Sequence, residues 1–206
     1  PVRYCPNCDQ PVGDHDLLEG DSAEIVHFVF VKYPFGEFFI PTATLRPETI
    51  FGVTNLWANP EVTYLKAEVD GEKWIISREA AEKLRMQKHT VTEIGTISGA
   101  ELVDKAATHP ISGAAVPILP ASFVDPDMGS GLVMSVPAHA PFDYIALRDL
   151  QQQGKYTEIV PIPLVTVPNF GKIPAQEIVE KNKIPHQDDP RMDELTQELY
   201  TAEFSK

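Results

Sequence analysis

The chain has little of what membrane-bound or disulfide-stapled proteins need. Its only cysteines among 206 residues are Cys5 and Cys8, too few for a disulfide scaffold. The longest apolar run, 25–31, is interrupted by His27 and falls far short of the ~20 residues of a membrane-spanning helix. The chain starts at Pro1 without an apolar leader or an initiator Met. We therefore expect a soluble cytoplasmic protein without a membrane partner, cut from a larger chain.

Motifs of common catalytic and metal sites are also missing. The sequence has no Gly-x-x-x-x-Gly-Lys, Gly-x-Gly-x-x-Gly, Gly-x-Ser-x-Gly or His-Glu-x-x-His. Cys5 and Cys8 have zinc-knuckle spacing, but a structural zinc needs four ligands, and Asp14 and His15 would complete only an unusual set. A reduced pair in a turn is the favoured interpretation, and we expect neither a metal nor a cofactor.

Positive charge is scarce as well. The chain has 17 Lys+Arg against 30 Asp+Glu, a net charge of −13. A surface that grips a nucleic-acid backbone is normally basic, so general binding to duplexes or long RNA is disfavoured. The 19 prolines disfavour long helical bundles, whereas 43% hydrophobic residues can form a sizeable core.

Short β-rich runs separated by turns dominate the chain. Aromatic and β-branched residues around Pro and Gly predict two hairpins, 24–33 with 37–44 and 62–69 with 72–77. Further strands are expected at 91–97, 131–136 and 158–167, with brief ones inside 109–120. Helices are expected at 78–87, 98–107, 141–153, 174–182 and 190–204, most of them after a capping Ser or a first-turn Pro. These elements predict a mainly β fold with peripheral helices and a β-barrel-like core.

The first segment with a chemical signal is Thr-Ala-Thr-Leu-Arg-Pro-Glu-Thr-Ile-Phe-Gly, residues 42–52. Thr42 and Thr44 share one face of a strand, where two hydroxyls can hold a polar ligand or a water. Arg46 follows at the strand end, where its donors could grip a phosphate, and Thr49 lies on the next turn. A threonine-rich strand ending in an exposed arginine is the alternative.

The second segment is Gly-Ser-Gly-Leu-Val-Met-Ser-Val-Pro-Ala-His-Ala-Pro-Phe-Asp, residues 129–143. Met134 and Val136 share one strand face, and Asp143 falls in the first turn of the following helix. There the helix dipole keeps a carboxylate ionised, suited to an ammonium group. The alternative is that Asp143 only complements the dipole and that His139 is a satisfied loop residue.

Both segments resemble the editing domain of class I aminoacyl-tRNA synthetases, and most closely the leucyl-tRNA synthetase editing domain (connective peptide 1) of the archaeal and eukaryotic type. Residues 11–20 and 173–181 are similar to its flanking parts. The resemblance implies one editing domain over 1–206, with 1–22 and 170–206 leading to the parent synthetase. The synthetic signatures His-Ile-Gly-His and Lys-Met-Ser-Lys-Ser are absent, so no aminoacylation site is expected in this chain.

The activity implied by the resemblance is post-transfer editing, the hydrolysis of the ester of mischarged tRNA-Leu carrying isoleucine, norvaline or methionine. One methylene changes binding by only ~1–3 kcal/mol, so a second sieve is needed. By resemblance, Asp143 would bind the substrate amino group, and Thr49, Met134, Val136 and His139 would surround the substrate. Thr42 and Thr44 would hold the carbonyl, the ribose or the attacking water. Arg46 would contact phosphates of the tRNA 3′ end.

Two departures from the family pattern and two alternatives stay open. Leu45 stands where many relatives have a second threonine, and Ala140 where bacterial-type members have an aspartate. A non-catalytic module that binds the tRNA end or an amino acid is one alternative. The editing domain of a valyl- or isoleucyl-tRNA synthetase is the other.

Overall fold

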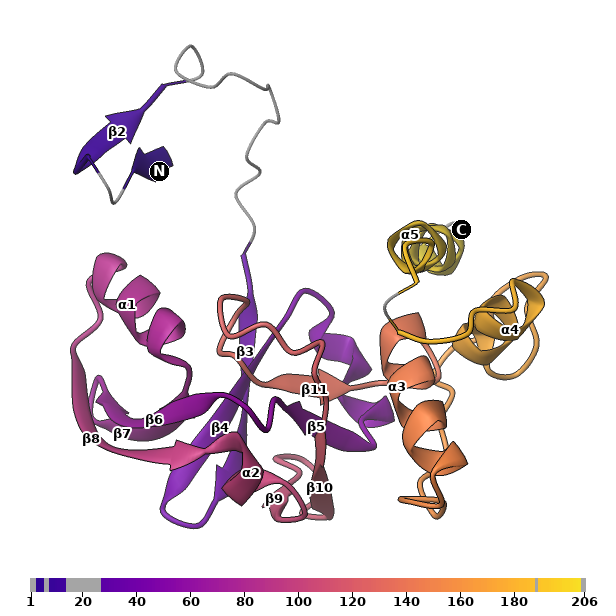
Figure 1. Cartoon of the computed structure of the whole chain (residues 1–206), viewed down its shortest axis with the longest axis horizontal. Coiled ribbons are helices and arrows are strands. Elements are labelled where there is room, and N and C mark those ends of the chain that lie inside the picture. The colour runs from indigo at the N-terminus through magenta and orange to yellow at the C-terminus, as the bar shows by residue number, and fades with distance from the viewer. Residues whose placement is uncertain (1–2, 6–7, 14–26, 188, 205–206) are drawn as a thin grey trace.

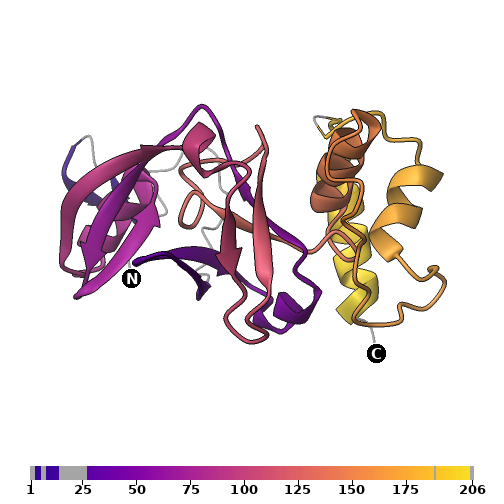
Figure 2. The same ribbon diagram turned by 90° about the horizontal axis from the view of Figure 1, so that it is seen from below.

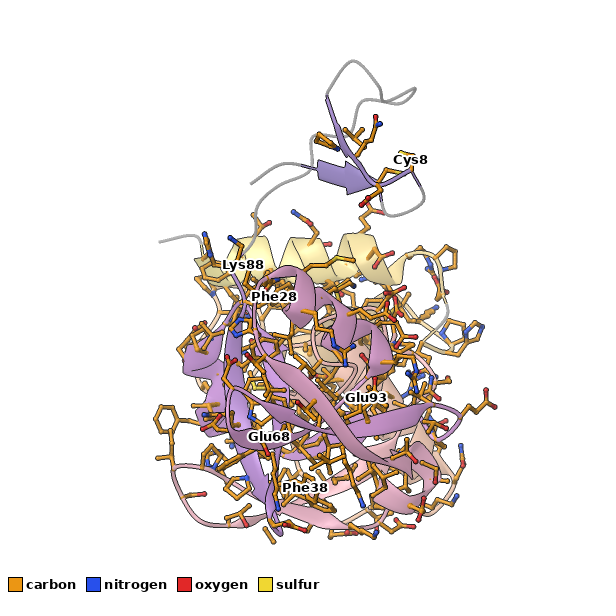
Figure 3. All side chains as sticks on the ribbon, turned by 90° about the vertical axis from the view of Figure 1, so that its left-hand side faces the viewer. Cys8, Phe28, Phe38, Glu68, Lys88 and Glu93 are labelled. Carbon is orange, nitrogen blue, oxygen red and sulfur yellow. The ribbon has the colours of Figure 1, made fainter. Side chains whose placement is uncertain are left out.

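The computed structural model describes residues 3–5, 8–13, 27–187 and 189–204. Its β-strands form three sheets, and the helices α3, α4 and α5 gather at one end of the larger sheets (Figure 1). The smallest sheet is the hairpin of β1 (Arg3–Cys5) and β2 (Gln10–Val12), with Cys8 in its turn (Figure 3). Among the described residues no cluster of three or more His, Cys, Asp or Glu side chains could hold a metal. Asp14 and His15 lie outside those residues.

The largest sheet has five strands in the order β3-β4-β7-β6-β8. Both predicted hairpins are confirmed within it, β3 (Val29–Phe35) with β4 (Phe38–Thr44) and β6 (Thr63–Val69) with β7 (Glu72–Ile76). Asp70 and Gly71 have positive φ between β6 and β7, as a two-residue hairpin turn requires. The strand β8 (Val91–Ser98) pairs antiparallel with β6, and residues 24–26 of the first predicted strand lie outside the described residues.

The second sheet has four strands in the order β11-β5-β10-β9. Its centre is β5 (Asn55–Ala58), which follows the 3₁₀ helix η2 (Pro47–Gly52). It pairs parallel with β10 (Ala115–Pro120) and antiparallel with β11 (Val133–Ser135), while β9 (Ala106–Thr108) pairs with β10. All four residues of β5 are buried, so this short strand occupies the middle of the protein.

The two larger sheets share one apolar core. Tyr33 and Ile40 of the first sheet and Leu56 and Ile118 of the second are fully buried in it. Each sheet keeps two edge strands, and among the described residues no strand pairing closes either sheet or joins the two (Figure 2). The mainly β fold with peripheral helices is therefore confirmed, but the barrel-like core is not.

Helices cover the sheets at both ends. The helix α1 (Arg78–Met86), capped by the Ser77 hydroxyl as predicted, packs on the five-stranded sheet. At the other end lie α3 (Pro141–Gln152), α4 (Pro174–Lys181) and α5 (Met192–Phe204) (Figure 2). These three helices bury an apolar cluster of their own. Of the described helices, none combines the length and the apolar character needed to cross a bilayer.

Two of the predicted elements are wrong. The helix expected over 98–107 has its capping box but ends early, as α2 (Gly99–Leu102). Backbone hydrogen bonds of Asp104 and Lys105 with Ile118 draw the chain into β9 beside β10 instead. The segment 158–167 forms no strand, because Pro161 and Pro163 have no N–H to donate to a ladder.

Candidate functional site

Strand pairing brings the two chemically distinctive segments side by side. The strand β5 follows the first segment after only Val53 and Thr54, and β11 belongs to the second segment. Beside them, the Thr54 N–H donates to the Ser135 carbonyl over 3.1 Å. Gly129 has a φ of +60°, and a Cβ there would lie 2.6 Å from the Ala43 Cβ, so only glycine permits this close approach.

A cavity of about 690 Å³ lies where the segments meet. Seven of the eight predicted site residues line it: Thr44, Arg46, Thr49, Met134, Val136, His139 and Asp143. Much of the remaining wall comes from Phe28, from the loop 123–128 and from α5. Leu45, which is exposed, and Ala140 are the two departures from the family pattern, and they also face this cavity.

Thr42, by contrast, does not reach the cavity. It is fully buried, and its hydroxyl donates to the Val31 carbonyl of the paired strand over 3.4 Å. The expectation that Thr42 and Thr44 hold one ligand together is therefore not supported, because the hairpin itself takes up the Thr42 hydroxyl.

The other two threonines bracket the backbone of Arg46. The Thr44 hydroxyl accepts from the Arg46 N–H over 3.0 Å, and the Thr49 hydroxyl donates to the Arg46 carbonyl over 2.7 Å. Thr44 thus keeps its own O–H proton for donation to a ligand, whereas Thr49 has already donated its proton. The two similar residues therefore offer the cavity different chemistry.

Asp143 is the buried carboxylate of the cavity. Its Oδ1 accepts from Trp57 Nε1–H over 2.9 Å and its Oδ2 from the Val136 N–H over 2.7 Å. Burial raises the pKa of Asp143 to about 7, although both hydrogen bonds act to lower it. The helix-dipole argument predicted a carboxylate that simply stays ionised, and desolvation overrides it.

His139 is held by the protein at both ring nitrogens. Its Nε2 accepts from the Leu164 N–H over 2.8 Å, so the ring proton is assigned to Nδ1, which lies 2.6 Å from Glu203 Oε1. No lone pair is left for proton transfer. The alternative of a satisfied loop residue is thus supported for His139, although its side chain does line the cavity.

Arg46 is enclosed by α5, which sequence reasoning had treated only as a flanking segment. Its Nη1 donates to Glu203 Oε2 over 2.6 Å, and its guanidinium lies 5.1 Å from the ring centroids of both Tyr200 and Phe204. The alternative of an exposed arginine at the strand end is therefore not supported, because the Arg46 side chain is largely covered by α5. The helical spacing of Tyr200 and Phe204 was the available signal, but apolar residues four apart equally indicate a core-facing helix.

Sequence comparison assigns the part of the chain that forms most of this cavity to a known family. Residues 36–182 match the family model for the leucyl-tRNA synthetase editing domain. The chain belongs to that family. The leucine–tRNA ligase of Methanocaldococcus jannaschii is 49% identical over 221 residues, which cover 100% of this chain and 23% of that protein. That of Methanothrix thermoacetophila is 48% identical over 212 residues, covering 99% of this chain and 22% of the relative.

Solved structures agree with the fold. A structure described as GlLeuRS-CP1 has a TM-score of 0.70 at 28% identity, covering 81% of this chain and 69% of that chain. The P. falciparum cytosolic leucyl-tRNA synthetase editing domain has a TM-score of 0.71 at 20% identity, with coverages of 81% and 68%. The family match identifies the leucyl type among the synthetase editing domains considered. This chain spans about a quarter of the length of its ligase relatives.

The region that matches the family model contains every predicted site residue but ends before α5. Sequence reasoning also missed Trp57, the buried partner of Asp143, although it lies only five residues beyond the first segment. A tryptophan in an apolar strand is typical of a core, and its N–H partner becomes visible only once β5 lies beside α3.

Proposed function

We propose that this domain edits mischarged tRNA-Leu by hydrolysing the ester between a noncognate amino acid and the terminal ribose. The observation that carries this proposal is one cavity that unites a buried carboxylate, Asp143, with the hydroxyls of Thr44 and Thr49, in a chain of the leucyl-tRNA synthetase editing family. Isoleucine, norvaline and methionine are the noncognate amino acids that the family resemblance implies.

Asp143 binds the α-ammonium group of the substrate. Each carboxylate oxygen already accepts one hydrogen bond and keeps lone pairs for another. An ammonium ion beside the carboxylate favours its charged form, so binding lowers the raised pKa of Asp143. The substrate amine thereby supplies the opposite charge that this buried site lacks.

The amino-acid side chain lies against Met134, Val136 and Thr49. The first two offer apolar surface. The Thr49 rotamer is fixed by the hydrogen bond to the Arg46 carbonyl, so its branched side chain sets the size limit of the pocket. A rigid wall is what a sieve against the correct leucyl ester requires.

Hydrolysis then proceeds by attack of a positioned water. The water oxygen bonds to the ester carbonyl carbon while the bond to the ribose oxygen breaks, and a water proton ends on that ribose hydroxyl. Thr44 donates its free O–H to the carbonyl oxygen, where negative charge develops. His139 is not placed as a general base, because both of its ring nitrogens are engaged by the protein. The remaining lone pairs of Asp143 are used by the substrate ammonium group, so Asp143 does not act as the base either. Positioning can itself supply several kcal/mol of the barrier.

Most tRNA affinity in this proposal comes from the rest of the ligase, since the domain carries a net charge of −13. The domain receives only the single-stranded 3′ end, whose phosphate meets Arg46. We accordingly propose that residues 1–206 work as one editing unit of a larger leucine–tRNA ligase in the cytoplasm.

The test is deacylation of isoleucyl-tRNA-Leu by the full-length ligase that carries this domain. Asp143→Ala should abolish hydrolysis and leave aminoacylation intact, whereas Asp193→Ala, an exposed carboxylate on the same cavity wall, should not. If Asp143→Ala hydrolyses as fast as the wild type, the editing assignment of this cavity is wrong and a binding module takes its place.

A further inference from the structure

The helix α5 supplies a buried carboxylate that connects the two halves of the site. The Glu203 side chain is 1% exposed. Its Oε2 accepts from Arg46 Nη1 and its Oε1 from His139 Nδ1, each over 2.6 Å. One partner belongs to the first recognised segment and the other to the second. A buried carboxylate is costly unless it is paired, and here both oxygens are used.

The His139 end of this connection is anchored in turn. Because the Leu164 N–H donates to His139 Nε2, the imidazole cannot turn over without losing one hydrogen bond. Because His139 is fixed, its hydrogen bond also fixes the Oε1 atom of Glu203. The Oε2 atom is thereby held at one position, where it accepts from Arg46.

The Arg46 end leaves one part of the guanidinium available. Nη1 is engaged by Glu203 and Nε by Glu48 at 3.3 Å. In the described part of the chain no acceptor is found for Nη2. A guanidinium is planar and rigid, so holding two of its nitrogens and placing its Cζ 5.1 Å from the ring centroids of Tyr200 and Phe204 also sets the position of the third nitrogen.

The packing of α5 indicates that this helix is a fixed part of the cavity wall and not a movable lid. Met192, Leu195 and Leu199 of α5 are buried in the cluster that the helix forms with α3 and α4. Displacing α5 would expose this cluster and would also leave Arg46 and His139 without their hydrogen bonds to Glu203. The helix is thus built as part of the cavity.

We infer that Glu203 is a positioning residue of the editing site, which acts by holding Arg46 so that its guanidinium receives a phosphate of the tRNA 3′ end. This inference rests on the proposed function. It extends the site to a helix outside the region that matches the family model. It also separates two tasks, because Asp143 and the threonines handle the ester while Glu203 serves only the phosphate.

The experiment uses the full-length ligase and two substrates, isoleucyl-tRNA-Leu and isoleucyl-adenosine, which has the ester but no phosphate. Glu203→Gln places an amide N–H₂ against one of the two donors. We expect kcat/KM on the tRNA to fall at least tenfold, mainly through KM, and kcat/KM on isoleucyl-adenosine to change less than twofold. Glu198→Gln, on the exposed side of the same helix, is the matched control and should change neither.

A double-variant cycle identifies the residue through which Glu203 acts. Arg46→Ala with Glu203→Gln should be no slower on the tRNA than Arg46→Ala alone. If Glu203→Gln melts at the assay temperature, Glu203→Asp replaces it, because the shorter acid keeps the charge and can hold only one partner.

The remaining outcomes overturn the inference in different ways. An equal loss on both substrates would make Glu203 a structural residue only, and no loss would leave it without a role. A faster reaction on the tRNA would make α5 a lid that competes for Arg46. If the wild type hydrolyses neither substrate, the proposed function itself fails.

Discussion

The buried indole of Trp57 gives the sharpest test of how the site handles charge. Trp57→Phe keeps an aromatic ring against Asp143 and removes the N–H that donates to Oδ1 over 2.9 Å. A hydrogen bond to a charged group contributes about 1.5–3 kcal/mol, and 1.36 kcal/mol corresponds to one pKa unit. The pKa of Asp143, already about 7, should therefore rise by about 1–2 units.

The consequence for editing is a shift of the acid limb of kcat/KM, which reports the free enzyme. With half of Asp143 ionised at pH 7 in the wild type, the variant should lose about 5- to 50-fold in kcat/KM at that pH. The alkaline limb belongs to the substrate α-amino group, ordinarily about 8, and should stay in place.

The assay is deacylation of isoleucyl-tRNA-Leu from pH 5.5 to 8.5, together with a ¹³C NMR titration of the Asp143 carboxyl. Phe123→Leu is the control, because Phe123 packs edge-on to Trp57 at 5.8 Å and its loss removes volume without removing the donor. That variant should keep the wild-type midpoint. Coincident acid limbs in Trp57→Phe and wild type would refute the reasoning, whatever the absolute rates.

Three further predictions concern the wall, the carboxylate and a backbone contact. Thr49→Ala should open the pocket and allow hydrolysis of leucyl-tRNA-Leu, whereas Thr49→Val should leave leucyl-tRNA-Leu intact. If Thr49→Ala also leaves leucyl-tRNA-Leu intact, Thr49 is not part of the sieve. In the folded state Asp143 keeps its proton up to about pH 7, so the free energy of unfolding should fall by about 3 kcal/mol between pH 4 and 7. Asp143→Asn should lack that slope in denaturant titrations, and equal slopes would contradict the raised pKa. Gly99→Ala would place a Cβ 1.9 Å from the Asn59 carbonyl oxygen and should lower the free energy of unfolding by at least about 3 kcal/mol. Gly95→Ala is the control, because the Lys66 atoms lie no nearer than 3.8 Å, and it should lower the free energy of unfolding by less than about 1 kcal/mol. Denaturant unfolding measures both.

Local signals in the sequence were sufficient for most elements. The Asp70-Gly71 turn, the Ser77 cap and the first-turn Pro141 each act within a few residues, and the structure has the hairpin and the helices there. One failure lies where a distant partner decides, because the chain after Leu102 is held by Ile118. The other, at 158–167, has a local cause in Pro161 and Pro163, and there Leu164 donates to His139 instead of to a neighbouring strand.

The candidate site divides in the same way. The residue types and their order in the two segments were enough to assemble seven of its side chains, because β5 and β11 bring those segments together. The burial of individual side chains could not be predicted from the sequence. Burial raises the pKa of Asp143, and it leaves the Thr42 hydroxyl bonded to the Val31 carbonyl instead of facing the cavity. Glu203 could not be predicted either, since an acid in an acidic helix is ordinarily a solvated one.

The pairing of Asn55 with Ser135 also predicts an order in which parts of this protein fold. The hairpins β3–β4 and β6–β7 close over short turns and can form within microseconds. The strand β5 pairs with β10 and β11, which are much farther away along the sequence, so we expect these pairings to form later than the hairpins. During refolding, strand signal should therefore recover well before editing activity, and a chain arrested between the two would carry both recognition segments with no cavity between them.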